Sequence, residues 1–423
     1  MPIFNWRFSR RNFLFGSSVL PAWAGWTPRR PQGSRGLWAA LGSLAGRSAA
    51  PPSIYDRLGV RTRINAKGTY TYLSGSLLPP EVAQAMKEAA EHYVVLEELQ
   101  RAVGARIAQM LGVEAACVTS GAAGAMTIGT AACVAGQDPE KIKRIPDTTG
   151  MKNEVVIQKA HRYAFDHAIR NVGVRLVEVE TEDDLERAIN EKTAMLHFAN
   201  FAQSQGKIGL AKWVDAGKRH SVPTFNDAAA DVPPVTHLSD YNKMGFDLVS
   251  FSGGKGLRGP QCAGLLLGRK DLIDAALMNN NPNEDTIGRP LKAGKEEIVG
   301  MFAALERYLR VDHAAEWKDW EARLDVIDKM VAGVPGVHTG RFVPAVANHV
   351  PHLYVQWDEK ALGLTKAECV KQLENGEPSI VCLGDDYPYG LSVTPFMMKP
   401  GEEEVVGRRL KQILSVAAKR QPE

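Results

Sequence analysis

The sequence predicts an α/β fold, in which a mainly parallel, seven-stranded sheet is followed by a smaller α+β domain at the C-terminus. Short apolar runs alternate with helical stretches between residues 115 and 268. That alternation is typical of parallel strands joined by helical crossovers, with helices on both faces of the sheet. After about residue 270 the apolar runs become rarer, and amphipathic helical patterns take over.

The elements of the large sheet domain can be placed in chain order. The segment 54–76 is mixed and loop-like, and Pro79-Pro80 begins a helix to about residue 94, with a second helix to about residue 111. A further helix begins at Thr181, which has the spacing of a capping box with Asp184. The seven predicted strands are 115–119, 155–158, 174–179, 195–199, 223–227, 248–251 and 263–268.

The C-terminal region predicts a smaller layered unit. Helices are expected over 295–310, 314–332 and 402–418, and strands over 353–356 and 379–383. Another helix begins at Thr365, again with capping-box spacing to Glu368. We therefore expect a signal and linker over 1–50, a large domain with an N-terminal arm over 51–290, and a small domain over 291–423.

The first 50 residues indicate an export signal. They hold seven arginines and no acidic residue, and residues 9–14 (SRRNFL) resemble the bacterial twin-arginine motif. A moderately apolar stretch follows and contains Ala22-Trp23-Ala24, a plausible cleavage site. We expect periplasmic export of the folded protein, or a cytoplasmic protein if the segment is only a basic extension. No apolar run is long enough to span a bilayer, so no stable membrane anchor is expected.

Composition narrows the class of protein. Hydrophobic residues are 44% and charged residues 23% of the 423 residues, which is ordinary for a globular enzyme. Without the seven N-terminal arginines, 44 basic residues face 48 acidic ones, a net charge of about −4 that disfavours nucleic-acid binding. The five cysteines form no CxxC pair, so no metal site is predicted.

The most informative stretch is 251–260 (FSGGKGLRGP), between two predicted strands. Small or turn-forming residues surround Lys255 and leave little bulk near its amine. Such an amine can enter a cleft and form a Schiff base with an aldehyde cofactor, a reaction that a lowered pKa favours. The alternative is a solvated lysine at the tip of a glycine-rich hairpin.

Two other strands end in suggestive residues. The first strand is followed by Ser120-Gly121-Ala122 and then by a helix of small residues. The start of such a helix can bind a phosphate. The alternative is a tight turn into a closely packed helix. The strand 223–227 ends in Asp227, whose carboxylate would point into the crevice where α/β proteins bind ligands. An aspartate there could instead cap a helix.

The order and spacing of the glycine turn, Asp227 and Lys255 resemble those of fold-type I pyridoxal-phosphate (PLP) enzymes. The chain is similar to the class V aminotransferase branch, and more so to selenocysteine synthase and D-glucosaminate-6-phosphate ammonia-lyase relatives. The resemblance covers roughly residues 53–420. It also includes the segments 64–69 (INAKGT) and 288–295 (GRPLKAGK).

The resemblance implies roles for these residues. Lys255 would bind the cofactor covalently and move the α-proton of the substrate, and Asp227 would keep the pyridine nitrogen protonated. The phosphate would be held by Ser120, Gly121 and Ala122, with help from Ser252.

The resemblance is less definite for four further residues. His161 follows the second strand, where related enzymes place a residue that stacks on the cofactor ring. His167 is the other candidate for this role, and either histidine could instead be structural. Arg258 and Arg289 are candidates for binding an anionic group of the substrate, although Arg289 could be an ordinary surface arginine. Gly390-Leu391-Ser392 lacks the arginine with which many aminotransferases of this fold bind the substrate carboxylate.

The expected function is therefore that of a PLP-dependent lyase. It would act on a small amino acid or amino sugar acid by α-proton removal and β-elimination, as a dimer or larger homo-oligomer. The alternatives are a PLP-dependent transferase or aminotransferase, and a selenocysteine synthase-like enzyme that transfers selenium to seryl-tRNA. A silent binding protein on the same scaffold is disfavoured because Ser120, Asp227 and Lys255 are all present.

Overall fold

The computed structural model describes residues 53–384 and 389–419. The predicted signal, with its arginine pair, lies outside the described residues. The chain divides into two compact units, residues 1–60 and 61–423. In the first, the short helix α1 (Ile54–Arg57) begins with a capping box between Ser53 and Asp56.

The second unit contains the predicted seven-stranded sheet, in the order β2-β8-β7-β6-β5-β3-β4. Pairing is parallel except that β8 runs antiparallel to both of its neighbours. The strands are β2 (Ala115–Thr119), β3 (Glu154–Gln158), β4 (Arg175–Val179), β5 (Thr193–Ala199), β6 (Thr224–Asp227), β7 (Leu248–Ser252) and β8 (Gly264–Gly268). Most of these strands are buried because helices cover both faces of the sheet, whereas the edge strand β4 is only partly buried. The predicted α/β class is confirmed.

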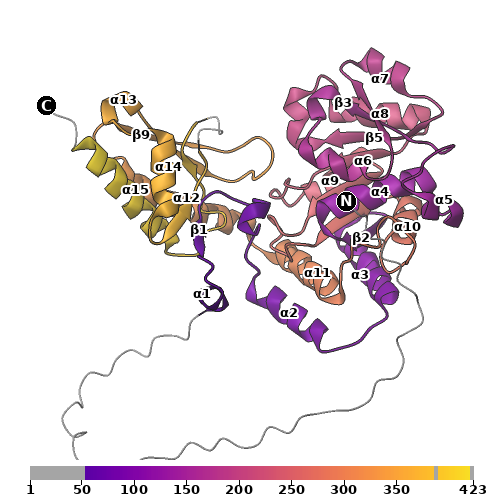
Figure 1. The fold of residues 1–423 in the computed structure, drawn as a ribbon, viewed down its shortest axis with the longest axis horizontal. Helices are drawn as coiled ribbons and strands as arrows, with labels where there is room; N and C mark the ends of the chain where they lie inside the picture. The colour runs from indigo at the N-terminus through magenta and orange to yellow at the C-terminus, as the bar shows by residue number, and fades with distance from the viewer. Residues whose placement is uncertain (1–52, 385–388, 420–423) are drawn as a thin grey trace, which may run out of the picture. The chain divides into compact units, whose positions relative to one another are not determined.

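Each face of the sheet packs on its own apolar core, and Figure 1 shows several of the covering helices. One core includes side chains of α3 (Leu96–Leu111), α8 (Leu210–His220), α9 (His237–Met244) and α11 (Lys295–Arg310). The opposite core includes side chains of α4 (Gly121–Ala135), α6 (His167–Arg170) and α10 (Lys270–Met278). The remaining helices of this region are α2 (Pro80–Ala90), α5 (Pro139–Arg144) and α7 (Glu182–Ala188).

Local chemistry explains where the helices begin and end. The Oγ atoms of Thr181 and Thr365 accept hydrogen bonds from the N–H groups of Asp184 and Glu368, as the capping-box spacing predicts. The first predicted helix ends at Ala90 rather than at residue 94. The residues that follow, 92–95 (HYVV), are aromatic or β-branched and have lower helix propensity.

The C-terminal region forms a separate small sheet and core. Strand β10 (His352–Trp357) runs antiparallel to β9 (Val337–Phe342) and β12 (Ser392–Val393), and the helices are α12 (His313–Val331), α13 (Glu359–Leu362), α14 (Lys366–Asn375) and α15 (Glu402–Ala418). Strand β1 (Arg63–Asn65) pairs with β11 (Ser379–Val381), so this early, indigo strand lies beside late elements of the chain (Figure 1). The predicted boundary at residue 290 stays a prediction.

Three strands were not predicted: β1, β9 and the two-residue strand β12. The segment 54–76 was expected to be loop-like, but it contains β1, whose three residues alternate an arginine, a buried isoleucine and an asparagine. Strand β9 was missed because only Val337 of its six residues is buried. None of the three forms a continuous apolar run, the pattern by which most of the other strands were recognised.

The turn between β7 and β8 is pinned by backbone contacts. The N–H of Gly253 donates to the carbonyl of Ala263 (2.8 Å), and the N–H of Gly259 donates to the carbonyl of Gly253 (2.8 Å). At Gly256 the chain passes so close to a neighbouring segment that an added Cβ would lie 2.1 Å from the carbonyl oxygen of Val232. The turn can therefore pack against Val232 only with glycine at residue 256, and this packing sets the position of Lys255.

We predict that Gly256→Ala destabilises the protein by about 1–3 kcal/mol, the usual cost of inserting a methyl group into a packed site. Urea unfolding would measure the change. Gly333→Ala is the matched control, because an added Cβ there meets nothing within 4 Å. Equal effects of the two substitutions would contradict the pinned turn.

Candidate active site

The predicted site residues come from strands that end at one edge of the sheet. Across β6 and β7, Asp227 is in register with Ser250. Across β7, β8 and β2, Ser252 is in register with Gly264, and Gly264 with Thr119. The segments that begin at Ser120 and Ser252, and the carboxylate of Asp227, therefore meet at this edge.

Lys255 lies in the pinned turn and is partly buried. No carboxylate of the described residues lies within ion-pair distance of its amine. Burial lowers the pKa of Lys255, and the charges of Asp227 and then Asp231 partly oppose that shift. A lysine in such surroundings yields the neutral amine, which is the nucleophilic form, more readily than a solvated lysine.

Asp227 is buried, and both of its carboxylate oxygens are held. Its Oδ1 accepts from the N–H of Ala229 (3.1 Å) and from Oγ of Ser250 (3.4 Å). Its Oδ2 accepts from Oη of Tyr163 (2.6 Å). These contacts fix the direction of the carboxylate before any ligand arrives.

Tyr163 is a site residue that the sequence analysis missed. It follows β3, two residues after His161, and its ring stacks on that of His197 with centroids 6.2 Å apart. Burial raises its pKa, and the charge of Asp227 raises it further, so the hydroxyl keeps its proton. The available signal was its place after a strand of the sheet, the same signal that led to His161.

His161 itself lies in a structural environment. Its ring is fully buried, with Nδ1 accepting from the N–H of Ala199 (3.3 Å) and Nε2 lying 3.2 Å from Nε2 of Gln158. Its ring meets Phe198 edge-on, and burial lowers its pKa to about 4. These contacts match the structural alternative, and among the described residues no hydrogen bond or ring contact joins His161 to Lys255 or Asp227. Ring stacking by His161 stays a prediction.

The turn from β2 into α4 leaves hydrogen-bonding groups open. Oγ of Ser120 is buried without a hydrogen-bond partner, and it does not cap the helix that begins at Gly121. Gly121 has a positive φ of 70°, and an added Cβ at Gly264 would lie 2.5 Å from its carbonyl carbon. The uncapped first turn of this 15-residue helix, with Ala122 buried within it, can bind an anion.

A second buried carboxylate, Asp231, lies four residues after Asp227. Its Oδ2 accepts from Nδ2 of Asn200 (2.5 Å) and from Oη of Tyr241 (3.1 Å), and its carbonyl oxygen is 2.8 Å from Nδ1 of His237. Burial raises the pKa of Asp231 to about 6, even though both side-chain hydrogen bonds act to lower it. This network was not predicted, because its members lie on three separate segments.

The two predicted arginines differ in their surroundings. Arg258 follows the turn, is partly buried, and donates from Nη2 to the carbonyl of Phe396 (3.0 Å). Arg289 is exposed on the segment between α10 and α11. Ser252 is partly exposed at the end of β7, where its N–H donates to the carbonyl of Ala229 (3.2 Å).

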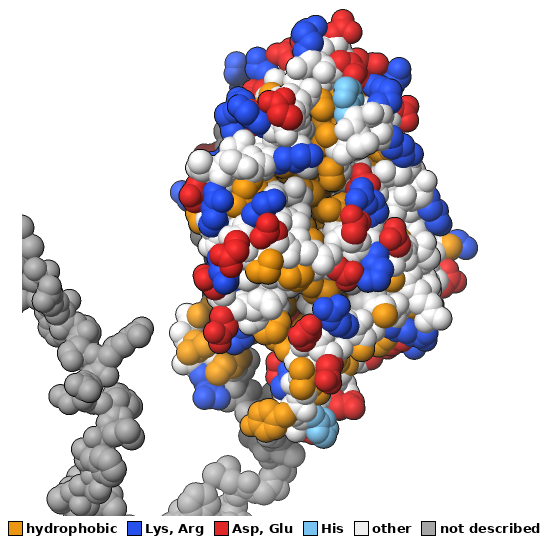
Figure 2. All heavy atoms as spheres, turned by 90° about the vertical axis from the view of Figure 1, so that its right-hand side faces the viewer, with side chains coloured by type: hydrophobic (Ala, Val, Ile, Leu, Met, Phe, Trp, Pro, Cys, Tyr) orange, Lys and Arg blue, Asp and Glu red, His pale blue; other side chains and the backbone are white. Residues whose placement is uncertain are grey.

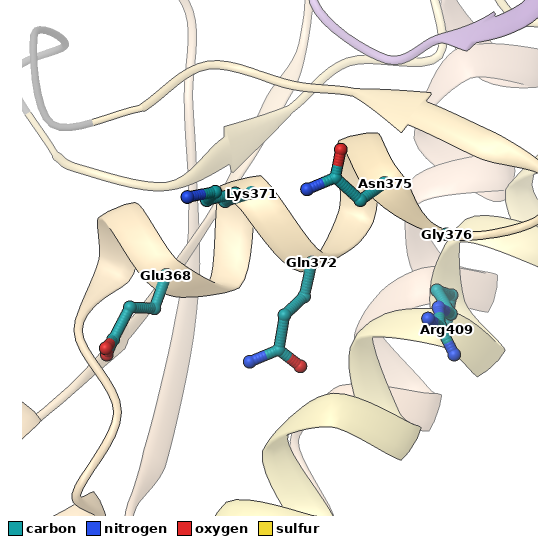
Figure 3. Close-up of a pocket in the computed structure, with 6 residues that line it drawn as sticks. All are labelled: Glu368, Lys371, Gln372, Asn375, Gly376 and Arg409. Carbon is teal, nitrogen blue, oxygen red and sulfur yellow. The ribbon is translucent and has the colours of Figure 1, made fainter.

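A surface pocket of about 400 Å³ lies in the C-terminal region between α14 and α15 (Figure 3). None of the predicted site residues lines this pocket. Two of its side chains already make hydrogen bonds within the helices: Glu368 closes the capping box of α14, and Arg409 donates to Gln412. It is lined by Glu368, Lys371, Gln372, Asn375, Gly376 and Arg409. Within residues 53–384 and 389–419, no cluster of three or more His, Cys, Asp or Glu residues is placed to hold a metal ion. No helix in those ranges is long and apolar enough to cross a membrane.

A lysine turn, an aspartate and an uncapped helix at one edge of a seven-stranded sheet are the arrangement of fold-type I enzymes. More particularly, the chain belongs to the L-seryl-tRNA selenium transferase (SelA) family, whose model matches residues 63–319. The prediction of this relationship is confirmed.

Two relatives match over nearly their whole length. The chain is 31% identical to a 5'-C-glycyluridine monooxygenase-decarboxylase from Streptomyces sp, over 85% of this chain and 92% of that protein. It is 30% identical to the D-glucosaminate-6-phosphate ammonia lyase of Salmonella typhimurium (strain 14028s / SGSC 2262), over 87% and 99%. The solved structure of a D-glucosaminate-6-phosphate ammonia-lyase superposes with a TM-score of 0.76 at 30% identity, covering 87% and 99% of the two chains. These relatives are enzymes, and one is a lyase, as the sequence predicted.

We predict that Asp231→Asn stabilises the protein above pH 6 but not below pH 4. The pKa of Asp231 in the fold, about 6, lies above its ordinary value of 3.8, so ionisation within the fold costs free energy. That cost is absent below pH 4 and complete above pH 6. The asparagine should add on the order of 2–3 kcal/mol to the free energy of unfolding at pH 8, measured in urea.

Asp215→Asn is the control, because Asp215 is exposed on α8. A stability difference between wild type and Asp231→Asn that stays constant from pH 4 to pH 8 would contradict the assigned cost.

Proposed function

We propose that this protein is a PLP-dependent lyase that removes the α-proton of a small amino acid or amino sugar acid and eliminates a β-substituent. The observation that carries the proposal is the partly buried amine of Lys255, free of ion pairs within the described residues, at the same sheet edge as Asp227. The ammonia lyase activity named for the Salmonella relative supports the same class of reaction.

The residues present fit the cofactor. The unpartnered Oγ of Ser120 and the uncapped first turn at Gly121 and Ala122 supply donors for a phosphate, with Ser252 at the neighbouring strand end. Asp227 supplies a carboxylate that can hold a ring nitrogen protonated. Tyr163, which now donates to Asp227, lies where an aromatic side chain can border the ring. Lys255 supplies the amine for the covalent link.

When bound, PLP supplies an electron sink for the electron pair released at the α-carbon of the substrate. Lys255 can take the α-proton, because burial favours its neutral amine. Asp227, whose carboxylate is held in one direction by Ala229 and Tyr163, would pair with the ring nitrogen of the cofactor. Departure of a β-substituent with its electron pair then needs a proton, which the Lys255 ammonium can return.

Several features favour a small substrate over a charged tRNA. On the face of the molecule shown in Figure 2, acidic and basic side chains are interleaved rather than gathered by sign. The chain beyond residue 50 also carries a net charge of about −4. We further propose that the protein forms a homo-oligomer, because large apolar side chains are exposed between residues 72 and 95 and could be buried against a second copy. These side chains are Tyr72, Leu77, Tyr93, Val94 and Val95.

Transamination is the second candidate reaction. It usually needs a fixed arginine for the carboxylates of two successive substrates. Leu391 and Ser392 are buried at the place where that arginine is expected, and neither carries a positive charge. The sequence of this segment therefore favours a lyase.

We predict that an amino acid or amino sugar acid with a β-hydroxyl leaving group yields ammonia and a keto acid without an added acceptor. Coupled assays of ammonia and keto acid across D- and L-substrates would measure the reaction. Lys255→Ala should abolish turnover, and Lys243→Ala, on α9, is the control. Turnover that requires an added keto acid, with the amine form of the cofactor accumulating in its absence, would instead establish transamination.

We also propose export by the twin-arginine route, which the basic, acid-free residues 1–50 support. Replacing Arg10 and Arg11 together by lysine should trap the folded protein in the cytoplasm. Cell fractionation would measure this, with Arg29→Lys plus Arg30→Lys as the matched control. Undiminished periplasmic recovery of the first variant would refute the assignment.

A further inference from the structure

The chain segment that carries Asp231 packs against the segment that carries Lys255. Asp231 directly precedes Val232, and Lys255 directly precedes Gly256. The last two residues are so close that a Cβ at residue 256 would lie 2.1 Å from the carbonyl oxygen of Val232. Two backbone hydrogen bonds join the same segments, from Ala228 N–H to the Ser250 carbonyl (3.1 Å) and from Ser252 N–H to the Ala229 carbonyl (3.2 Å).

The carboxylate of Asp231 is buried, and only one of its oxygens is bonded. The residue is 4% exposed. Its Oδ2 accepts from Asn200 and Tyr241, whereas its Oδ1 has no hydrogen-bond partner among the described residues. An asparagine has the same shape, and its carbonyl oxygen could accept the same two hydrogen bonds. The network therefore does not require a negative charge at residue 231, although the fold maintains one at a cost.

The groups around Asp231 determine when it is ionised. Burial raises its pKa to about 6, and the charge of Asp227 adds to this effect. Asn200 opposes the shift, and so do Tyr241 and His237 of α9. Above about pH 6 the carboxyl group is therefore mostly ionised.

Two carboxylates act on the amine of Lys255. Burial lowers its pKa, and the charges of Asp227 and then Asp231 partly oppose that shift. When the cofactor is bound, Asp227 would pair with the ring nitrogen, which offsets its charge. Asp231 has no such partner, because no cation of the described residues lies within ion-pair distance of its carboxylate. The charge of Asp231 is therefore the one left to act on the amine.

We propose that Asp231 is a positioning residue for proton transfer at Lys255, because its charge stabilises the ammonium group that forms when the amine takes the α-proton of the substrate. The inference rests on the function proposed above. In this step the proton moves from the α-carbon to Nζ of Lys255, and the electron pair of the broken C–H bond stays with the substrate and cofactor. Asp231 neither gives nor takes a proton.

The separation of the two charges suits this role. A carboxylate in direct contact with Lys255 would hold the ammonium form and leave little neutral amine to act as a base. No carboxylate of the described residues lies that close. A charge at a longer distance favours the ammonium more weakly. Asp231 thus strengthens the base without pairing with it, whereas burial alone would leave the base weak.

Labelling of the full chain without cofactor tests the effect of Asp231. A limiting amount of acetic anhydride acetylates neutral amines, and peptide mass spectrometry over a range of pH gives the labelling midpoint of Lys255. Asp231→Asn should lower this midpoint by about one pH unit, because the ammonium loses a stabilising charge. Asp215→Asn removes the same charge from an exposed position on α8 and should leave the midpoint unchanged. Asp231→Glu keeps the charge and should retain the wild-type midpoint.

The loaded enzyme supplies a second readout. In Asp231→Asn the acid limb of the pH profile of kcat should move to lower pH by the same amount, while KM stays nearly unchanged. A loss of folded protein would lower the rate equally at every pH and would leave the acid limb where it is.

The inference fails if Asp231→Asn leaves the labelling midpoint of Lys255 at the wild-type value. It also fails if Asp231→Glu lowers the midpoint as much as Asp231→Asn does, since the shape of the network and not its charge would then be the cause. If Asp231→Glu does not fold, the comparison of Asp231→Asn with Asp215→Asn decides alone. Labelling needs neither cofactor nor substrate, so its failure is distinguishable from a failure to release ammonia.

Discussion

The rest of the site depends on one constraint, the burial of the Lys255 amine in a turn that cannot move. Glycine at residue 256 lets this turn touch the carbonyl of Val232, and the turn is tied by backbone hydrogen bonds to Ala263. The amine is thereby kept away from ion pairs while remaining in the field of Asp227 and Asp231. A lysine held in this way loses its proton more readily than a surface lysine, which is the property that carbonyl chemistry requires.

Around this lysine the fold tolerates features that weaken it. Oγ of Ser120 and Oη of Tyr308 are buried without partners, and Asp231 is a carboxyl group whose ionisation burial disfavours. Other buried polar groups are satisfied, as at Gln158, whose amide bonds both backbone groups of Ile208. The open hydroxyl of Ser120, beside the uncapped start of α4, is what a binding site for an anionic cofactor would require.

Much of this arrangement could be predicted from the sequence because it follows strand ends. Most strands of the large sheet are apolar and buried; Asp227 is the last residue of one of them, and Lys255 follows the end of another by three residues. Asp231 could not be predicted, since its role depends on contacts between distant segments. Asp231, for example, meets Asn200 31 residues away in sequence. Tyr163 was within reach, but His161 carried the same positional signal, and only the hydrogen bond to Asp227 separates them.

The central claim is that Lys255 holds the cofactor, and covalent labelling tests it most directly. Borohydride reduction of the purified protein, followed by proteolysis and peptide mass spectrometry, locates a pyridoxyl group. The account predicts this group on the peptide that contains Lys255 and its loss in Lys255→Ala. A label on Lys243 or Lys270, or no label on protein purified with PLP, would contradict the account.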